Sequence, residues 1–248
     1  MSLQPLIKWA GGKEQELKYI IPCLPKTINR YFEPFIGGGA LYFNMKQNEM
    51  FINDKSNELI ALYNCIKNND EEFYKYIDLI IKDWNEVDKI IDTQEFLEFY
   101  KNFNITDIHS TNRIGLHNNL KTWIEEQINK MTFILNLNID KNDFIKELER
   151  NIFSKIKRVN KIEEEEEKME EKALIDSFHC ALKGSYYMYI RNLYNKSKDI
   201  NAYHTSLFFF IRNLSYSGMF RYNKDGGFNV PYGGIGYNRK KRISMVSH

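Results

Sequence analysis

The hydrophobic pattern of this chain changes its period near residue 70. Before that point, segments of strand character alternate with segments of helical character. The predicted strands lie at 31–33 and 51–53, and the predicted helices at 40–47 and 56–67. Beyond residue 70, large apolar side chains such as Phe73, Ile77 and Ile80 recur at helical spacing as far as about residue 201. The pattern predicts an α/β protein in which a βαβα unit precedes a long helical segment.

These changes divide the chain into three predicted parts. Residues 1–68 form an α/β part, residues 69–205 a helical insertion, and residues 206–248 a loop-rich segment with a basic tail. The stretch from 214 to 238 is rich in Gly, Tyr, Asn and Ser, which is typical of loops and hairpins. Because binding residues concentrate on loops, this last part is a candidate binding segment.

A run of charged residues interrupts the helical insertion, with five glutamates at 163–167 followed by mixed charges to residue 172. It has two interpretations, an acidic interaction surface or a solvated helix junction. Blocks of like charge are usually solvated, so the run is assigned no function.

Composition excludes several classes of protein. The 248 residues carry 35 basic and 33 acidic side chains, so any nucleic-acid affinity must come from local patches. The three cysteines are far apart and the five histidines form no ligand pair, which argues against disulfides and a metal site. The longest apolar run, residues 207–211, is much shorter than the roughly 20 residues of a membrane helix. We expect a soluble, cytoplasmic protein without a membrane segment.

A glycine triplet follows the first predicted strand in the sequence FEPFIGGGALYFN, residues 32–44. Glycines between a strand and a helix let a ligand approach the backbone at the helix N-terminus. Asp54 follows Gly37 by 17 residues, close to the spacing of an acid that binds ribose hydroxyls. The third glycine of a dinucleotide fingerprint would fall on Tyr42, which favours a ribose-containing cofactor without pyrophosphate, such as S-adenosylmethionine. Alone, such a triplet is more often a plain tight turn, but the segment described next supports the binding interpretation.

A second glycine-containing segment, LIKWAGGK, occupies residues 6–13. Trp9 offers an aromatic face and Lys13 a cation beside a flexible backbone, which suits stacking on an adenine or binding a carboxylate. The alternative is a core tryptophan beside a glycine turn.

The order of four segments, KWAGGK, FEPFIGGGA, NDKSNELIALYN and FRYNKDGGFNVPYG, resembles the Dam-type DNA adenine-N6 methyltransferases. The resemblance covers residues 6–68 and 207–237 and nothing specific between them. It implies a Rossmann-like class I methyltransferase sheet, incomplete in this chain, and S-adenosylmethionine as cofactor. The cofactor contacts it implies are Trp9, Lys13, Glu33, Pro34, Phe35, Gly37, Gly39 and Asp54.

The same resemblance places residues 226–234 in target recognition. Its catalytic box, Asp-Pro-Pro-Tyr, occurs nowhere in the 248 residues, and Asn229-Val230-Pro231-Tyr232 is one residue away from Asn-Pro-Pro-Tyr. The catalytic residues are therefore unknown, with Asn229, Pro231 and Tyr232 as candidates. Without the box, we expect an incomplete chain or one part of a split enzyme, whose missing C-terminal part or second polypeptide carries it.

The segment NLSYSGMFRYN mixes aromatic, polar and basic side chains on a predicted loop, which suits contacts to base edges and insertion between bases. Two residues of the basic tail, Arg239 and Lys240, suit phosphate contacts, although a solvated basic turn explains that tail equally well. The predicted contacts to duplex DNA are Tyr216, Ser217, Met219, Arg221, Tyr222, Asn229, Arg239 and Lys240.

These features predict a DNA methyltransferase that transfers a methyl group from S-adenosylmethionine to the N6 amine of adenine. Two alternatives stay open. One is a non-catalytic DNA-binding protein that retains the cofactor fold, and the other is an enzyme in which residues 229–232 act as the catalytic box.

Overall fold

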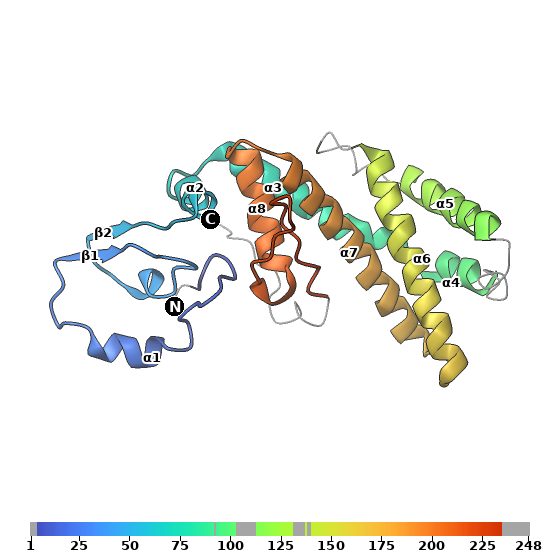
Figure 1. Ribbon diagram of the computed structural model, residues 1–248, viewed down its shortest axis with the longest axis horizontal. Helices are drawn as coiled ribbons and strands as arrows, with labels where there is room; N and C mark the ends of the chain where they lie inside the picture. Colours follow the sequence, from blue (N-terminus) through green and yellow to red (C-terminus); the bar gives the residue numbers. More distant parts are fainter. Residues whose placement is uncertain (1–3, 92, 103–112, 131–136, 138–139, 235–248) are drawn as a thin grey trace. The chain divides into compact units, whose positions relative to one another are not determined.

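The computed structural model describes residues 4–91, 93–102, 113–130, 137 and 140–234 (Figure 1). These residues fall into two compact units. The first unit comprises the described residues of 1–77 together with 193–233, and the second comprises those of 78–192 together with Gly234. Each unit is considered by itself. The predicted division at residues 69 and 205 stays a prediction.

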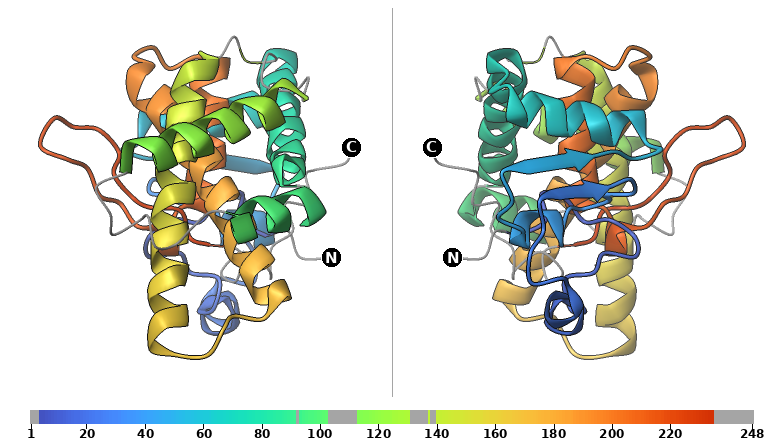
Figure 2. Two further views of the ribbon diagram at one scale, coloured as in Figure 1. Left: turned by 90° about the vertical axis from the view of Figure 1, so that its right-hand side faces the viewer. Right: turned by 90° about the vertical axis from the view of Figure 1, so that its left-hand side faces the viewer.

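A two-stranded parallel sheet forms the N-terminal part of the first unit. Strand β1 spans Arg30–Glu33 and strand β2 spans Glu49–Ile52, with Arg30 opposite Glu49 and Glu33 opposite Ile52. Figure 2 shows the two strands side by side. The backbone N–H of Asn53 donates to Glu33 O at 2.9 Å, which continues the pairing beyond the strand ends. Both predicted strands are confirmed, with bounds shifted by one or two residues.

The connection between the strands contains a single turn of 3₁₀ helix, η2 (Tyr42–Asn44), so the helix predicted at 40–47 is wrong. After η2 the backbone is extended at Met45. The Asn44 side chain donates to Ala40 O at 2.9 Å and so competes with the backbone for this carbonyl. Nucleating a helix costs more free energy than the hydrogen bonds of a single turn recover. The chain must also reach the start of β2 within a few residues. Two short helical turns that precede β1 were not predicted, α1 (Leu17–Ile20) and η1 (Ile21–Cys23).

Helix α2 spans Asn57–Lys67 and confirms the helix predicted at 56–67. Ser56 caps it, because the Ser56 hydroxyl oxygen accepts the N–H of Leu59 at 3.2 Å. Leu59, Leu62 and Tyr63 are buried on one face of the helix, which packs against helix α8 (Ala202–Leu214). This packing fixes the place of α8, and therefore the point at which the next segment begins.

A buried polar cluster joins three helices within the first unit. Glu58 of α2 accepts hydrogen bonds from the Tyr194 hydroxyl and from the His204 ring, whose Nε2 lies 2.8 Å from Glu58 Oε1. Tyr194 belongs to helix α7 (Glu171–Lys196). Burial opposes the Glu58 carboxylate, but the hydrogen bonds from His204 and Tyr194 outweigh it and hold the pKa of Glu58 below its ordinary value of 4.5.

The segment after α8 is a turn followed by a hairpin, as predicted. One antiparallel bridge, Ser215 to Tyr232, comes directly before the 3₁₀ turn η6 (Tyr216–Gly218), and a second, Tyr222 to Phe228, follows it. The Asn223 side-chain oxygen accepts the N–H of Gly227 at 2.6 Å and closes the tip. The hairpin is also held by Asn195 of α7, whose amide bonds both backbone polar groups of Phe228.

The elements described in the second unit are all helices. Phe178 packs against Phe96 with ring centroids 4.5 Å apart, and both rings are fully buried. The described helices with residues in this unit are α3 (Glu71–Glu86), η3 (Val87–Ile90), α4 (Thr93–Asn102), α5 (Arg113–Asn129), α6 (Lys141–Glu165) and α7. The long helical segment predicted from the apolar spacing is therefore present.

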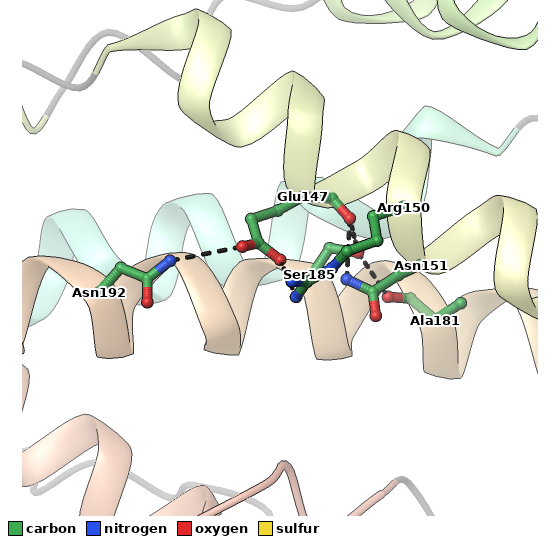
Figure 3. Close-up of polar contacts among 6 residues, drawn as sticks. All are labelled: Glu147, Arg150, Asn151, Ala181, Ser185 and Asn192. Atoms are coloured by element: carbon green, nitrogen blue, oxygen red, sulfur yellow. Dashed lines mark hydrogen bonds and ion pairs between the residues drawn. The ribbon is translucent and has the colours of Figure 1, made fainter. Parts of the chain in front are cut away.

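Polar side chains fix the contact between α6 and α7 (Figure 3). The Glu147 carboxylate accepts from Asn192 of α7 at 3.4 Å and from Arg150 of its own helix at 2.6 Å. The Ser185 hydroxyl donates to Glu147 O at 3.4 Å. The glutamate run at 163–167 lies where α6 ends, before α7 begins at Glu171, and residues 164–167 are exposed. This placement is in keeping with the solvated-junction interpretation, and the run stays without an assigned function.

No helix among the described residues is long and apolar enough to cross a bilayer. The same residues contain no group of three or more His, Cys, Asp or Glu side chains that could hold a metal ion.

We predict that Glu58→Gln lowers the free energy of unfolding at pH 7 by about 1–3 kcal/mol, because it weakens hydrogen bonds to a buried charge. A carboxyl group whose pKa is lowered on folding stabilises the fold at pH values above its pKa in the unfolded chain. This contribution is lost as the pH falls through its lower pKa in the folded protein. The free energy of unfolding of the wild type should therefore decrease as the pH is lowered beyond about 4.5, and that of the variant should decrease less. Urea unfolding at pH 7, 5, 4 and 3 measures both effects.

The exposed Glu14 provides a matched control, because Glu14→Gln removes a carboxylate that the fold does not bury. An equal loss of stability in Glu14→Gln and Glu58→Gln would contradict the assignment of the cluster as a stabilising contact.

Candidate functional site

The glycine triplet lies at the carboxyl ends of the two strands, where Asp54 holds it. The Gly37 N–H donates to one Asp54 carboxylate oxygen at 3.0 Å, and the Ser56 N–H donates to the other at 3.0 Å. On its other side, Gly37 O accepts the Tyr63 hydroxyl at 3.1 Å. The loop is thereby tied to the end of β2 and to α2.

Gly39 has no room for a side chain. Its φ of +78° lies in the left-handed region, and a Cβ there would lie 2.5 Å from the Tyr63 hydroxyl and 2.8 Å from the Phe43 ring. A Cβ on Gly37 would lie 2.8 Å from Trp9 Cδ1. Aromatic rings therefore cover this backbone closely, so the triplet is more than a plain turn on the surface.

The segment at 6–13 lies against the glycine triplet, as the close approach of Trp9 to Gly37 shows. The Trp9 indole is half-buried and meets the Phe220 ring edge to face at 4.5 Å. Gly12 N–H donates to Trp9 O at 3.1 Å, and Lys13 is exposed at the end of this turn. Trp9 thus packs within the protein, in keeping with the core interpretation, and its part in binding a cofactor stays a prediction.

Two carboxylates lie at the same edge of the sheet, Glu33 at the end of β1 and Asp54 after β2. Glu33 accepts the Tyr31 hydroxyl at 2.7 Å, and burial raises the pKa of Glu33 against the opposing effect of this hydrogen bond. Burial also raises the pKa of Tyr63, with a further contribution from Glu33. Beside them, Pro34 is exposed and the Phe35 side chain is 80% exposed. This edge offers acceptors for hydroxyl groups next to an open apolar ring.

The predicted nucleic-acid contacts lie together on η6 and the hairpin. Tyr216, Ser217, Met219 and Tyr222 are exposed. Arg221 is exposed too, and its Nε donates to Asn229 O at 2.7 Å, so this guanidinium also braces the hairpin. The predicted phosphate contacts, Arg239 and Lys240, lie outside the described residues.

Residues 229–232 form one arm of the hairpin. Pro231 O accepts the Tyr216 N–H at 2.9 Å, and the Asn229 N–H donates to Arg221 O at 2.8 Å. Val230 is buried, whereas Asn229 and Pro231 are exposed, which is the alternation of a strand with one packed face. The side chain of Asn229 therefore faces solvent while its backbone pairs across the hairpin.

Arg212 was not predicted, yet it contacts both candidate segments. It lies near the end of α8, and its guanidinium donates to the carbonyl oxygens of Lys8, Gly218 and Met219. An arginine directly after the apolar run 207–211 was the available sequence signal, because a cation in such a run needs buried partners. Tyr63 and Asn195 were also missed, since their partners lie far away in the sequence.

Comparisons with known proteins give a family match and several relatives. Residues 9–181 match the family model described as D12 class N6 adenine-specific DNA methyltransferase. The chain is 43% identical over 77 residues to Type II methyltransferase M1.LlaDCHI of Lactococcus lactis subsp. cremoris, covering 31% of this chain and 27% of that protein. It is 37% identical over 67 residues to the DNA adenine methylase of Escherichia coli (strain K12), covering 27% of this chain and 24% of that protein. The matched segments thus span about a quarter of these relatives.

We predict that Gly39→Ala destabilises the first unit more than Gly226→Ala does. Both glycines have φ near +77°, but a Cβ on Gly226 would meet nothing within 4 Å. Gly226→Ala should therefore cost only the backbone strain of about 1–2 kcal/mol. Gly39→Ala adds the clash with Tyr63 and Phe43, which is worth about 1–3 kcal/mol more. Urea unfolding of the two variants measures the difference, and equal losses would contradict the close packing of the triplet.

Proposed function

The chain belongs to the D12 class N6 adenine-specific DNA methyltransferase family, and we propose that its residues build the cofactor-binding and target-recognition parts of such an enzyme. The reaction is transfer of a methyl group from S-adenosylmethionine to the N6 amine of adenine in duplex DNA. The observation that carries the proposal is the pairing of Asp54 with the Gly37 N–H at the carboxyl ends of two parallel strands. Ligands of open α/β sheets bind at this edge.

The residues around the glycine triplet fit S-adenosylmethionine. Each Asp54 carboxylate oxygen accepts one backbone N–H and keeps a second lone pair, which can accept a ribose hydroxyl. The exposed Phe35 ring offers a face for the adenine, and Glu33 and Lys13 offer polar contacts to the rest of the molecule. In this proposal β1 and β2 are the first strands of a Rossmann-like class I methyltransferase sheet. Pro34, Gly37, Gly39 and Trp9 shape its cofactor edge.

The exposed side chains of η6 and the hairpin suit the second task, reading duplex DNA. Methylation of an exocyclic amine requires the base to leave the helix, because the amine is inaccessible within the stack. Met219 and the rings of Tyr216 and Tyr222 can fill or flank the space that the base leaves. Arg221, Ser217 and Asn229 supply hydrogen-bonding groups for base edges, and Arg239 and Lys240 supply cations for phosphates.

Methyl transfer needs acceptors that are held rigidly beside the amine. The N6 amine must donate its hydrogens to acceptors so that its lone pair can attack the electrophilic methyl that the sulfonium supplies. At the place of the first proline of the box stands Val230, whose side chain is buried and which lacks the ring that makes a proline backbone rigid. We therefore assign Asn229, Pro231 and Tyr232 to recognition. The Pro-Pro-Tyr segment would come from a second polypeptide or another part of the protein.

A non-catalytic DNA-binding protein that retains the cofactor fold is the second candidate. The commitment of residues 229–232 to hairpin pairing favours it, because it leaves these 248 residues without a catalytic box. The two candidates differ in cofactor dependence, since only the enzyme part must bind S-adenosylmethionine beside its target.

We predict that the 248-residue chain binds S-adenosylhomocysteine and that Asp54→Asn weakens this binding by roughly 10-fold or more, because the amide nitrogen cannot accept a hydroxyl. Phe35→Ala, which removes an exposed ring and leaves the fold intact, should weaken it by a smaller factor. Asp199→Ala removes an exposed acid elsewhere in the first unit and serves as the control. Isothermal titration calorimetry measures the affinities, and circular dichroism checks folding.

The same samples are then assayed for transfer of labelled methyl from S-adenosylmethionine to mixed-sequence duplex DNA. Cofactor binding without transfer supports the proposal. Absence of cofactor binding in the folded wild type contradicts it in favour of the non-catalytic candidate. Transfer that is lost in Asn229→Ala would instead make residues 229–232 the catalytic box.

A further inference from the structure

Arg212 joins two segments that lie about 200 positions apart in the sequence. Its Nη1 donates to Met219 O at 2.8 Å, and its Nη2 donates to Gly218 O at 3.0 Å and to Lys8 O at 3.2 Å. Lys8 directly precedes Trp9 in the proposed cofactor segment, and Gly218 and Met219 belong to the proposed recognition loop. One guanidinium thus bonds to the backbone of both.

Aromatic rings enclose the same guanidinium. Its Cζ lies 3.8 Å from the centroid of Phe220, 5.2 Å from that of Trp9 and 5.7 Å from that of Phe228. Arg212 is only 1% exposed. At a buried site, both the cation–π attraction and the hydrogen bonds to carbonyl oxygens are stronger than at the surface. The geometry of the three carbonyls is therefore fixed by the planar fork of this side chain.

The two segments also touch one another directly. A Cβ on Gly218 would lie 3.0 Å from Lys8 Cβ, so the loop backbone packs against the cofactor segment without space between them. Trp9 meets Phe220 at 4.5 Å, and Ser217 is held at a φ of 55°, which its neighbours must impose. A shift of one segment therefore has to move the other or break these contacts.

We propose that Arg212 is a positioning residue that couples cofactor binding to DNA binding. The inference rests on the proposed function, since it assigns the cofactor to the segment at Trp9 and the DNA to the loop at 216–222. A ligand that orders one segment orders the carbonyls that Arg212 holds, and these belong to both segments. Coupling of this kind is reciprocal, so DNA must strengthen cofactor binding by the same factor by which the cofactor strengthens DNA binding.

The test compares wild type with Arg212→Lys, which keeps the charge but replaces the planar fork of donors with a compact ammonium on a flexible stem. The affinity for S-adenosylhomocysteine is measured by calorimetry with and without a saturating pool of random-sequence duplexes, and the ratio is the coupling factor. We expect a factor of about 5 or more in wild type and close to 1 in Arg212→Lys. Affinity for S-adenosylhomocysteine alone should change much less. Arg30→Lys, at an exposed arginine over the Phe32 ring, is the matched control with wild-type coupling.

A second variant, Phe220→Ala, removes the closest ring from Arg212 and leaves the three hydrogen bonds in place. It should lower the coupling factor to a value between those of wild type and Arg212→Lys. If Arg212→Lys does not fold, the coupling factor of Phe220→Ala alone tests the role of Arg212. Unchanged coupling in the folded variants, or no coupling in wild type, overturns the inference alone. A wild type that binds neither S-adenosylhomocysteine nor DNA overturns the proposed function as well.

Discussion

The Asp54 carboxylate is the contact on which the rest of the first unit depends. One oxygen holds the N–H of Gly37 and the other holds the N–H of Ser56, so a single side chain fixes the glycine loop and the start of α2. A carboxylate that accepts backbone N–H groups forms stronger hydrogen bonds than neutral acceptors do. Replacing it would weaken both attachments together, while Tyr63 still holds Gly37 and Ser56 still caps α2.

Polar contacts then connect α2 to helices α7 and α8. Glu58 of α2 binds Tyr194 of α7 and His204 of α8, which fixes the direction in which α8 leaves the cluster. Arg212 near the end of α8 then holds the carbonyls of Lys8 and of the loop after α8. These hydrogen bonds have defined directions, so they favour one arrangement of apolar helices that otherwise pack without direction. The same contacts place the candidate recognition loop beside the candidate cofactor segment.

The sequence predicted the local structure of this unit better than its long-range contacts. Strand and helix patterns identified β1, β2 and α2, and the resemblance grouped Trp9, the glycine triplet and Asp54, which the structure brings together. The helix expected at 40–47 failed because its few residues stand between a left-handed glycine and a strand. Arg212 was missed because its partners include a residue 204 positions away. No local pattern encodes such a pairing.

Hydrogen–deuterium exchange of the 248-residue chain, with and without S-adenosylhomocysteine, tests the central claim most directly, because it reports where the ligand binds. The account predicts slower exchange in peptides that cover residues 6–13, 33–39 and 53–56, with no change in α6. Protection confined to α6 and α7, or to the hairpin at 222–232, would contradict the assignment of the cofactor site to the glycine triplet and Asp54.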